Sequence, residues 1–600
     1  MCGISGFYSS SPDRLNSKHF EIFNSSLSHR GPDFSGILRT KYSWIGHNRL
    51  AIIDLTTHAN QPLHATHQNI DYSIVFNGEI YNYIEIREQL KSLGHSFKTQ
   101  SDTEVVLKSY IEWGAKCYSK FNGMWALAIY NHKNDSLHLS RDRFGVKPLY
   151  LYFHKEDLFF ASEVKAFAKL PQPFTLICNT LLLKFLVKRP DNQSILKKPI
   201  CCLPAGNYLT ISNNKELILK KWWDLEQHIP SLENLNSTEV IEKFKNIFIS
   251  ALELRTRSDA KLCSSLSGGL DSSTIVSVQA ENLKHKQNSE YKAFIFEYKT
   301  KEQSELQYAL NVCEQKKVPY TLYSLDATSK ELNPQTLTDC IYTSEQLGNL
   351  QIGPYLLYES MQKEGYKVSI DGHGADEILG GYIQFAIPSL ADALVTGGKE
   401  SFQKTLQSWK NDDDTYLVDP NHCLNGIYKL IKSKDPKCDG NWMTRERKYE
   451  FQSKTLPWLL NTYDKMPMRH GIEVRSPFLD YRLVTFAFAL SNNYLVGNNY
   501  TKNIIREAFK HYLPSSILTR KNKKGFLPSK FFFLNSQAIR EMIADISGSE
   551  DFKSSKWFDG INSSKSIHKA IESKDINSLH KNWPLIQTTL FVREWQKNST

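Results

Sequence analysis

The hydrophobic pattern of the chain changes near Ser237, and this change constrains the fold more than any other feature. Before it, short β-rich runs with tight turns, such as 124–130, are interrupted by helical stretches such as 79–93. After it, amphipathic helical stretches such as 239–250 alternate with buried-strand runs such as 292–298. The pattern predicts an α+β domain of mostly antiparallel strands, followed by an α/β domain in which helices flank a parallel sheet.

The length of the chain agrees with a division into large domains. Its 600 residues correspond to about four domains of roughly 150 residues or to two large ones. The polar segment around Pro230 is the best linker candidate. We therefore expect a first domain at 1–215, a linker at 216–237, a second domain at 238–528 and a C-terminal extension at 529–600, whose sequence indicates no role.

Composition excludes several classes of protein. With 40% hydrophobic and 23% charged residues, the chain has the composition of a globular protein and not of a disordered or fibrous one. It contains no apolar run of about 18 residues, so no membrane span is expected. The net charge of +11 is spread in short lysine pieces, which favours a solvated surface over nucleic-acid binding.

The ten cysteines indicate neither a disulfide framework nor a zinc site, because they are sparse for the length and no CxxC pair occurs. The N-terminus also lacks a basic region followed by an apolar core, the pattern of a secretory signal. A reducing, cytoplasmic location is the expectation.

Cys2 is the most informative single residue. Removal of Met1 would place a thiol and a free α-amino group on one residue, and an α-amino group has an ordinary pKa of about 7.7–8.0. Such an amine can take the proton of the thiol, so that Cys2 would supply both nucleophile and general base.

Several motifs follow Cys2 in order. They are MCGISGF from residue 1, HRGPD from 29, RLAIIDL from 49, FNGEIYN from 76, SDTE from 101, RDRFGVKPLY from 141 and SEVK from 162. Together they resemble the class II, N-terminal nucleophile (Ntn) glutamine amidotransferase domain. The resemblance implies an Ntn-hydrolase sandwich of antiparallel sheets with flanking helices.

The resemblance also implies roles for six residues. Cys2 would attack the side-chain amide of glutamine, giving a thioester and ammonia, while Asn77 and the N–H of Gly78 would form the oxyanion hole. The glutamine-binding residues implied are Arg49 for the α-carboxylate, and Glu79 and Asp102 for the α-ammonium group.

A second motif lies at residues 267–273. It follows a buried-strand run at 261–266 and precedes a helical stretch that begins at about 274. Glycines permit a sharp turn and close approach of the backbone, and successive N–H groups at a helix start attract anions. The loop lacks the Walker A pattern and matches the SGGxDSS loop of the PP-loop ATP pyrophosphatases. The implied ATP and pyrophosphate ligands are Ser267, Gly268, Gly269, Asp271, Ser272 and Ser273.

An acidic cluster at 371–377 follows another buried-strand run. Mg²⁺ binds hard oxygen ligands and commonly bridges one or two carboxylates to phosphates. We expect Asp271 and Asp376 to hold Mg²⁺. Asp371 and Glu377 are either further site residues or a helix cap and a surface acid.

Two later segments, 466–480 and 500–508, complete the set of motifs. With the loop and the acidic cluster they resemble the asparagine synthetase C-terminal domain, and the chain to about 526 resembles a glutamine-hydrolysing asparagine synthetase. The resemblance implies an α/β PP-loop domain with a parallel sheet, ATP and Mg²⁺ as co-substrate and metal, and Lys502 as the lysine that stabilises negative charge. Arg475 is expected to support the same site.

The two sites together predict one coupled reaction. A carboxylate, most often aspartate in this family, is activated as an acyl-adenylate, and ammonia from glutamine displaces AMP. The products would be the amide, AMP, pyrophosphate and glutamate. The implied partners are small molecules, with neither nucleic acid nor membrane, and family members often form homodimers.

The segment Asp371, Gly372, His373 and Gly374 is the expected acceptor site, and it departs from the family. Aspartate-using members mostly carry an acid where this chain has His373. Imidazole in place of an acid changes charge and proton inventory. The departure is either neutral variation or a mark of another acceptor, such as a sugar acid of a surface polysaccharide or a natural-product intermediate.

Three other classes fit the sequence less well. A β-lactam-forming relative would lose the N-terminal cysteine, and a tRNA-modifying PP-loop enzyme would not need the glutaminase motifs. An inactive binding protein would have no reason to retain Cys2, Asn77, Asp271, Asp376 and Lys502.

Overall fold

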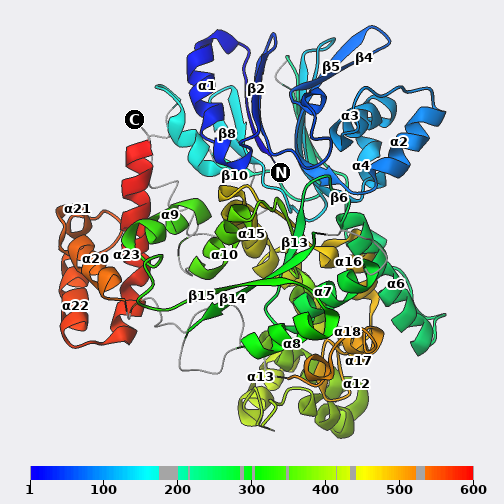
Figure 1. The fold of residues 1–600 in the computed structure, drawn as a ribbon, viewed down its shortest axis with the longest axis vertical. Helices are drawn as coiled ribbons and strands as arrows, with labels where there is room; N and C mark the ends of the chain where they lie inside the picture. Colours follow the sequence, from blue (N-terminus) through cyan, green and yellow to red (C-terminus); the bar gives the residue numbers. More distant parts are fainter. Residues whose placement is uncertain are drawn as a thin grey trace.

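The computed structural model describes the chain except residues 1, 175–199, 214–215, 284–289, 300–304, 346, 348–350, 414, 433–440, 522–533, 535 and 599–600. Two bodies are stacked along the long axis of the molecule, with the N-terminal one at the top of Figure 1. A group of C-terminal helices lies against their side.

The N-terminal domain contains two six-stranded sheets in which every strand pair is antiparallel. Across the first sheet the strands are β10 (Ile200–Cys202), β8 (Tyr150–His154), β9 (Asp157–Ala161), β1 (Gly3–Tyr8), β3 (Ser43–Arg49) and β2 (Phe34–Arg39). Across the second they are β12 (Leu217–Lys221), β11 (Asn207–Ile211), β7 (Ser136–Arg141), β6 (Gly123–Asn131), β5 (Ile70–Ile80) and β4 (Leu63–His67).

Alternation along the strands builds four layers. Ile4 of β1 packs with Val75 of β5 in the core between the sheets. Phe7, on the opposite face of β1, packs with Phe20 of helix α1 (Ser17–Ser25). On the far side, α2 (Tyr83–Ser92) and α3 (Asp102–Trp113) cover the second sheet (Figure 1). The predicted antiparallel sandwich with flanking helices is confirmed.

The C-terminal domain is built on a five-stranded parallel sheet. Its strands are, in order, β15 (Tyr320–Leu325), β14 (Lys292–Tyr298), β13 (Leu262–Ser265), β16 (Val368–Ile370) and β17 (Glu473–Arg475). Helices cover both faces, as parallel sheets require. Ala293 and Ile295 pack on the side of α6 (Ser237–Arg255) and α7 (Leu270–Leu283), and Phe294 on the side of α10 (Ile352–Lys363) and α15 (Thr455–Arg469).

Two segments differ from the sequence-based expectation. Glu79 lies in β5 and not in a helix, because pairing with β6 continues to Ile80 and α2 begins only at Tyr83. Within the predicted linker 216–237, Leu217–Lys221 forms strand β12 at the edge of the second sheet. Its lysines stay in solvent at this edge, which gives the strand the polar composition of a linker.

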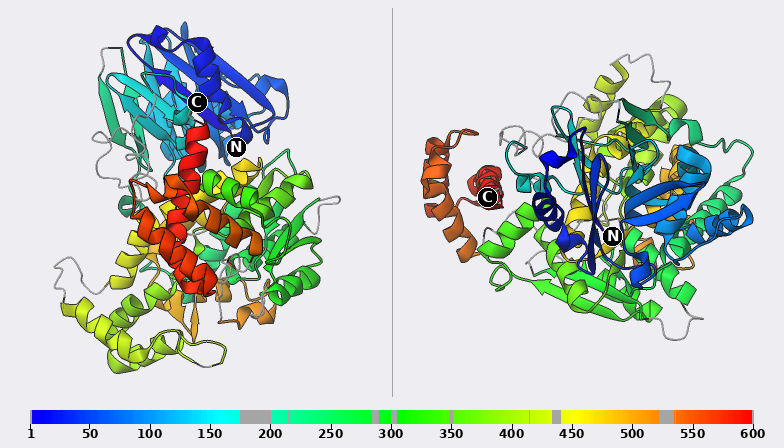
Figure 2. Two further views of the ribbon diagram at one scale, coloured as in Figure 1. Left: turned by 90° about the vertical axis from the view of Figure 1, so that its left-hand side faces the viewer. Right: turned by 90° about the horizontal axis from the view of Figure 1, so that it is seen from above.

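The predicted C-terminal extension forms α20 (Gln537–Gly548), α21 (Glu550–Lys553), α22 (Gly560–Glu572) and α23 (Ile576–Asn598). Helices α20 and α23 pack on α9 (Pro334–Ser344) of the second domain, and α23 also contacts the 3-10 helix Val164–Lys169 of the first. Figure 2 shows α23 rising beside the N-terminal domain. The extension therefore packs against both domains.

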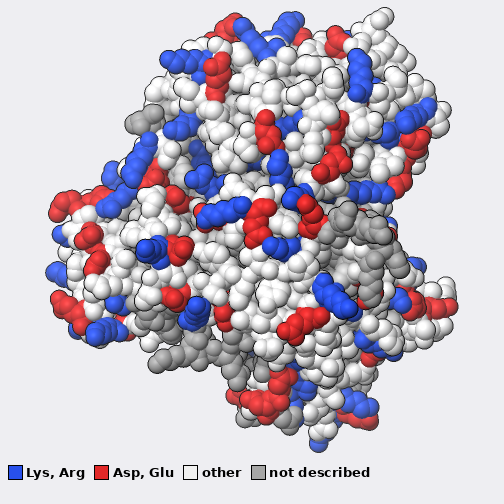
Figure 3. Space-filling view, in the orientation of Figure 1, with Lys and Arg blue, Asp and Glu red and all other residues white. Residues whose placement is uncertain are grey.

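The surface carries mixed charge. On the face seen in Figure 3, lysines and arginines alternate with acidic residues. One helical stretch, Ala375–Gln407, is long and apolar enough to cross a membrane, but 61% of its most apolar window is buried in the protein, as in a core helix. The eight cysteines in the described chain are all free thiols.

Buried charges hold the two domains together. Glu345, in the left-handed region at φ 48°, accepts the backbone N–H of Lys165 at 2.7 Å and pairs with Lys465 of α15 at 2.5 Å. Glu345 is 1% exposed. Removing one partner of such a pair leaves the other charge buried and unpaired.

We expect Glu345→Ala to lower the stability of the protein by about 3–5 kcal/mol, because the Lys465 ammonium loses its carboxylate. Calorimetry would register a fall of several degrees in the unfolding temperature. Glu331→Ala, at an exposed position, is the matched control and should leave that temperature unchanged. Equal unfolding temperatures for both variants would contradict this role of Glu345.

Candidate active sites

The first candidate site lies at the start of β1. The Cys2 backbone N–H donates to the Asn77 side-chain oxygen at 3.1 Å, and Cys2 Sγ lies 4.0 Å from the carbonyl oxygen of Leu50. Burial raises the pKa of the Cys2 thiol above its ordinary value. At neutral pH the thiol is therefore protonated, and attack on an amide needs a base close to it.

Asn77 and Gly78 lie beside Cys2 on β5. With its oxygen held by Cys2, the Asn77 side-chain nitrogen is buried and has no hydrogen-bond partner in the structure. A buried donor without an acceptor is costly unless a ligand supplies one. A Cβ at position 78 would come within 2.2 Å of the Met124 carbonyl oxygen, so the close approach of β6 requires glycine there.

Arg49 ends β3 and faces a loop. Its guanidinium donates to the Thr56 carbonyl oxygen at 2.6 Å, to the Asn60 side-chain oxygen at 2.8 Å and to the Asp54 carbonyl oxygen. These contacts fix the direction of the predicted carboxylate-binding fork. The structure therefore brings Arg49 to the edge of the Cys2 site in a rigid setting.

Glu79 and Asp102 are the two predicted ammonium-binding acids. Asp102, at the first turn of α3, accepts the Ile80 N–H at 2.9 Å, and burial raises its pKa to about 6. Burial also raises the pKa of Glu79, and the nearby Glu473 adds to that rise. Both predicted ammonium-binding acids are thus buried, with raised pKa values that a bound cation would lower.

If Asp102 binds the α-ammonium group of glutamine, as the motif implies, its carboxylate makes that binding pH-dependent. Only the ionised carboxylate binds an ammonium group, and with a pKa raised from 3.8 to about 6 the carboxylate is lost on acidification through pH 6. We expect the KM for glutamine to rise as the pH falls through about 6, by up to about tenfold per unit well below it. Steady-state kinetics measures it. Asp102→Asn should raise KM without that midpoint, whereas a wild-type KM unchanged down to pH 5 would contradict the role of Asp102.

The sequence did not predict the contacts of two arginines at this site. Arg30, buried in the HRGPD motif, donates to the Cys2 carbonyl oxygen at 3.1 Å and pairs with Asp464 of α15 at 2.8 Å. Arg475 was expected at the ATP site, but its guanidinium lies 3.3 Å from Glu79 and also contacts Glu473. Both arginines belong to motifs that the sequence shows. Their partners become apparent only when the two domains pack together.

The second candidate site follows β13. The loop turns at Gly268, with φ 76°, where a Cβ would come within 2.8 Å of the Ala309 nitrogen. Ser267 Oγ lies 3.1 Å from Ser272 Oγ and accepts the N–H of Gly269 at 3.3 Å. The fourteen-residue helix α7 then begins at Leu270 and places Ser272 and Ser273 in its first turn. The predicted strand, loop and helix are present.

Lys502 lies at the mouth of this loop. Its ammonium contacts the carboxylates of Asp271 and Asp376, each at 2.6 Å. A Cβ at Gly381 would come within 2.0 Å of the Asp376 carboxylate and 2.1 Å of the Lys502 side chain, so this glycine makes room for the cluster. Three residues from three separate motifs therefore meet at one point.

The same two carboxylates fit a Mg²⁺ ion that also binds phosphate. They already converge on one cation, and Mg²⁺ at nucleotide sites commonly takes only one or two protein carboxylates. Within the described chain, no cluster of three or more metal-binding side chains occurs. An ion held here would depend on phosphate oxygens and water for its other ligands.

The remaining acids of the cluster have other partners. Asp371 accepts the Tyr358 hydroxyl at 2.7 Å and the Ser369 hydroxyl at 2.6 Å. Glu377 is buried, accepts the Tyr382 hydroxyl at 2.8 Å and has its pKa raised by burial to about 7. Glu377 is therefore not a surface acid. Asp371 is also buried, and its carboxylate accepts the backbone N–H of Ser265 at 3.3 Å.

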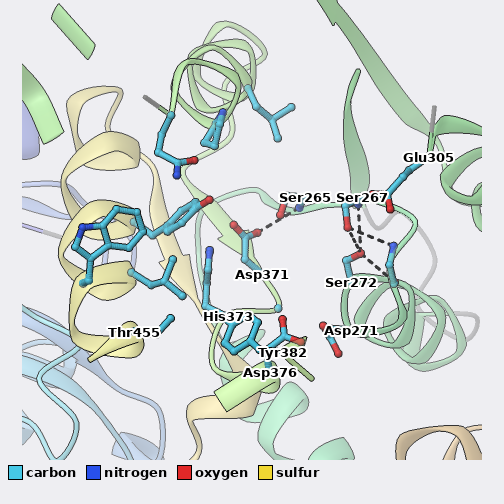
Figure 4. A pocket seen from close by; sticks show the side chains of 18 of the residues that line it. Ser265, Ser267, Asp271, Ser272, Glu305, Asp371, His373, Asp376, Tyr382 and Thr455 are labelled. Carbon is cyan, nitrogen blue, oxygen red and sulfur yellow. Dashed lines mark hydrogen bonds between the residues drawn. The ribbon is translucent and has the colours of Figure 1, made fainter. Parts of the chain in front are cut away.

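A cavity of about 600 Å³ connects the loop with the expected acceptor segment. Figure 4 shows Ser267 and Ser272 on one side, Thr455 on the other, and Asp371 and His373 between them. The His373 ring lies 4.1 Å from the ring of Tyr463, and burial lowers the pKa of its imidazole. The His373 carbonyl oxygen accepts the Ser476 hydroxyl.

Glycines shape the acceptor segment on both sides of His373. Gly374 has φ 90°, and a Cβ there would come within 2.4 Å of Leu479. At Gly372, a Cβ would lie 3.2 Å from the Asp271 side chain. The segment therefore passes close to the loop, and the predicted acceptor and ATP residues share one cavity.

Comparison with known proteins agrees with this geometry. The glutamine amidotransferase domain family matches residues 1–223, and the asparagine synthase family matches residues 243–596. The glutamine-hydrolysing asparagine synthetase 3 of Bacillus subtilis (strain 168) is 27% identical over 570 residues, which are 92% of this chain and 91% of the relative.

Two further relatives differ in their names. The glutamine-hydrolysing asparagine synthetase B of Escherichia coli (strain K12) is 25% identical over 542 residues, covering 87% of this chain and 82% of the relative. The amidase chyE of Penicillium rubens is 25% identical over 659 residues, covering 97% and 96%. The chain therefore belongs to the asparagine synthase family, and it is a glutamine-dependent enzyme of the asparagine synthetase type.

Proposed function

We propose that this enzyme transfers the amide nitrogen of glutamine to a carboxylate through an acyl-adenylate. The observation that carries the proposal is the meeting of Lys502 with Asp271 and Asp376 at the mouth of the loop, in the cavity that also contains His373. A fixed cation beside a phosphate loop stabilises the charge that develops when the α-phosphate is attacked.

In the glutaminase half, Cys2 Sγ attacks the side-chain carbonyl carbon of glutamine, and its proton passes to the α-amine of Cys2. Asn77 Nδ2, which has no partner in the structure, and the Gly78 N–H receive the oxyanion. The C–N bond then breaks, the amine returns the proton, and ammonia leaves. Water hydrolyses the thioester, giving glutamate and the free thiol.

Glutamine is held from its other end. Arg49 would bind the α-carboxylate, and Glu79 and Asp102 the α-ammonium group. The buried setting of both acids strengthens such pairs, since charges interact more strongly away from water.

In the synthetase half, an acceptor carboxylate oxygen attacks the α-phosphorus of ATP and the bond to pyrophosphate breaks. Ammonia then attacks the acyl carbon, and AMP leaves with the carboxylate oxygen. The loop at 267–273 would hold the phosphates and Lys502 would stabilise the negative charge. Mg²⁺, held by Asp271 and Asp376, would neutralise pyrophosphate.

The segment that joins the two sites supports coupling between them. Arg475 contacts Glu79 at the glutaminase site, and the next residue, Ser476, donates to the backbone of His373 at the acceptor site. The adjacent residues Arg475 and Ser476 thus contact one residue of each site, and we propose that ammonia crosses the protein beside this segment. Protonation in bulk water would remove its nucleophilicity, so a dry internal path favours synthesis.

ATP–pyrophosphate exchange over a panel of carboxylates that includes aspartate tests the proposal. We expect carboxylate-dependent exchange, and AMP and glutamate among the products of the full reaction. ADP and phosphate formation without exchange for every carboxylate would contradict an acyl-adenylate. The names of the relatives include both asparagine synthetases and amidases, so aspartate and another carboxylate are both candidates.

A further inference from the structure

The end of the cavity remote from the ATP loop is built from two helix faces. On α15, Thr455, Trp458, Leu459 and Tyr463 line it, with the three- and four-residue spacing of one helical face. On α10, Pro354, Leu357 and Tyr358 do the same. Aromatic and aliphatic side chains, partly exposed to the cavity, therefore form the wall that an acceptor would touch.

The described lining of the cavity offers a second carboxylate neutral donors, such as the side chains of Gln351 and Thr455, but no cation. Among the described residues that line the cavity there is no lysine or arginine, and the four charged side chains, Asp271, Glu305, Asp371 and Asp376, are all acidic. The cations nearest to them are already paired, Lys502 with Asp271 and Asp376, and Arg520 with Glu305. A second carboxylate, bound away from Lys502 and against the faces of α10 and α15, would therefore be desolvated without a paired cation, which is unfavourable.

His373 marks the reacting end of this space. The centroid of its ring is 4.1 Å from that of the Tyr463 ring. Figure 4 shows His373 beside Asp371 in the cavity. An acceptor whose carboxylate reaches the loop at His373 must therefore place the rest of its body against Tyr463 and Trp458. Flat or chair-shaped rings bury the most apolar surface on such aromatic faces.

We infer that the acceptor is a ring-bearing monocarboxylate, with no second anionic group, whose ring packs on Trp458 and Tyr463. This inference rests on the proposed amidation and names its substrate class. Aspartate fits this lining less well, because its α-carboxylate would have no cation among the described lining residues. Aromatic acids and hexuronic acids share the required chemistry.

The test is ATP–pyrophosphate exchange by the full-length enzyme with three probes: 4-hydroxyphenylacetate, glucuronate and aspartate. We expect at least one ring acid to exceed aspartate by about tenfold or more in kcat/KM, as pocket contacts commonly provide. The better ring acid identifies the source, aromatic or sugar. Exchange that is equal or faster with aspartate would overturn the inference and leave the proposed function intact.

A binding measurement separates the two proposals. Titration with the ring acids should change the tryptophan fluorescence of the wild type in a saturable way, and Trp458→Phe should lose that change. If the ring acids bind in this way but no carboxylate supports exchange, the proposed adenylation fails and the pocket inference stands. If the ring acids neither bind nor exchange, the inference is wrong.

Trp458→Ala gives a third readout. We expect it to raise the KM for the ring acid about tenfold or more, because the stacking face is lost. Trp113→Ala, on a tryptophan of the other domain that is similarly half-buried, is the matched control and should leave this KM unchanged. Hydrolysis of glutamine by both variants checks that they are folded. An unchanged KM in Trp458→Ala would count against the assigned wall.

Discussion

Cys2→Ala should abolish glutamine-dependent amide synthesis, with a loss of at least about 10³-fold in kcat, while ammonium salts still support synthesis. The variant removes the proposed attacking atom and leaves the ATP site untouched. Cys2 and Lys502 lie in different domains, one at the start of β1 and the other before α18 (Asn503–Ala508). Ammonia supplied from solution should therefore reach the acyl-adenylate.

Glutamate formation and amide formation would be measured in parallel. Cys117→Ala is the matched control, because Cys117 is also a fully buried thiol of the first domain but packs in the core under α3. It should retain glutaminase activity. Retained glutaminase activity in Cys2→Ala would refute the assigned nucleophile, and loss of ammonia-dependent synthesis in that variant would refute separable sites.

Lys502→Ala should have the opposite effect. We expect ATP–pyrophosphate exchange to fall by about 10²–10³-fold, because one preorganised cation at a developing charge is worth that much. Hydrolysis of glutamine should continue. The two variants together would assign one half-reaction to each domain.

The loss of Lys502 also leaves two carboxylates facing each other, so a folding defect must be separated from a catalytic one. Lys502→Arg keeps the charge between Asp271 and Asp376 and should fold normally, while its different geometry still lowers exchange. Lys510→Met, at an exposed lysine nearby in sequence, is the control and should be fully active. Full exchange activity in Lys502→Ala would contradict the proposed role.

Local chemistry explains why much of the site could be predicted. Cys2, Asn77 and the loop at 267–273 act through residue types that few alternatives can replace, and each belongs to a short contiguous motif. The periodicity of strands such as Lys292–Tyr298 depends only on near neighbours, and the structure places that strand where the pattern predicted it.

Other features depend on tertiary packing and could not be predicted in this way. Arg475 contacts Glu79 because β17 ends at the domain interface, which is a consequence of the order of strands in the sheet. Glu345 ends α9 in a left-handed conformation, and its carboxylate accepts two backbone N–H groups of the other domain. The apolar wall at Trp458 becomes recognisable only when α10 and α15 face each other.

The central claim is that nitrogen passes from glutamine to the acceptor inside one protein. Glutamine labelled with ¹⁵N in its side-chain amide, supplied together with unlabelled ammonium and the acceptor that gives the fastest exchange, tests it directly. Mass spectrometry of the amide product should show ¹⁵N undiluted by the free ammonium. Dilution to the isotope ratio of the solution would contradict internal transfer.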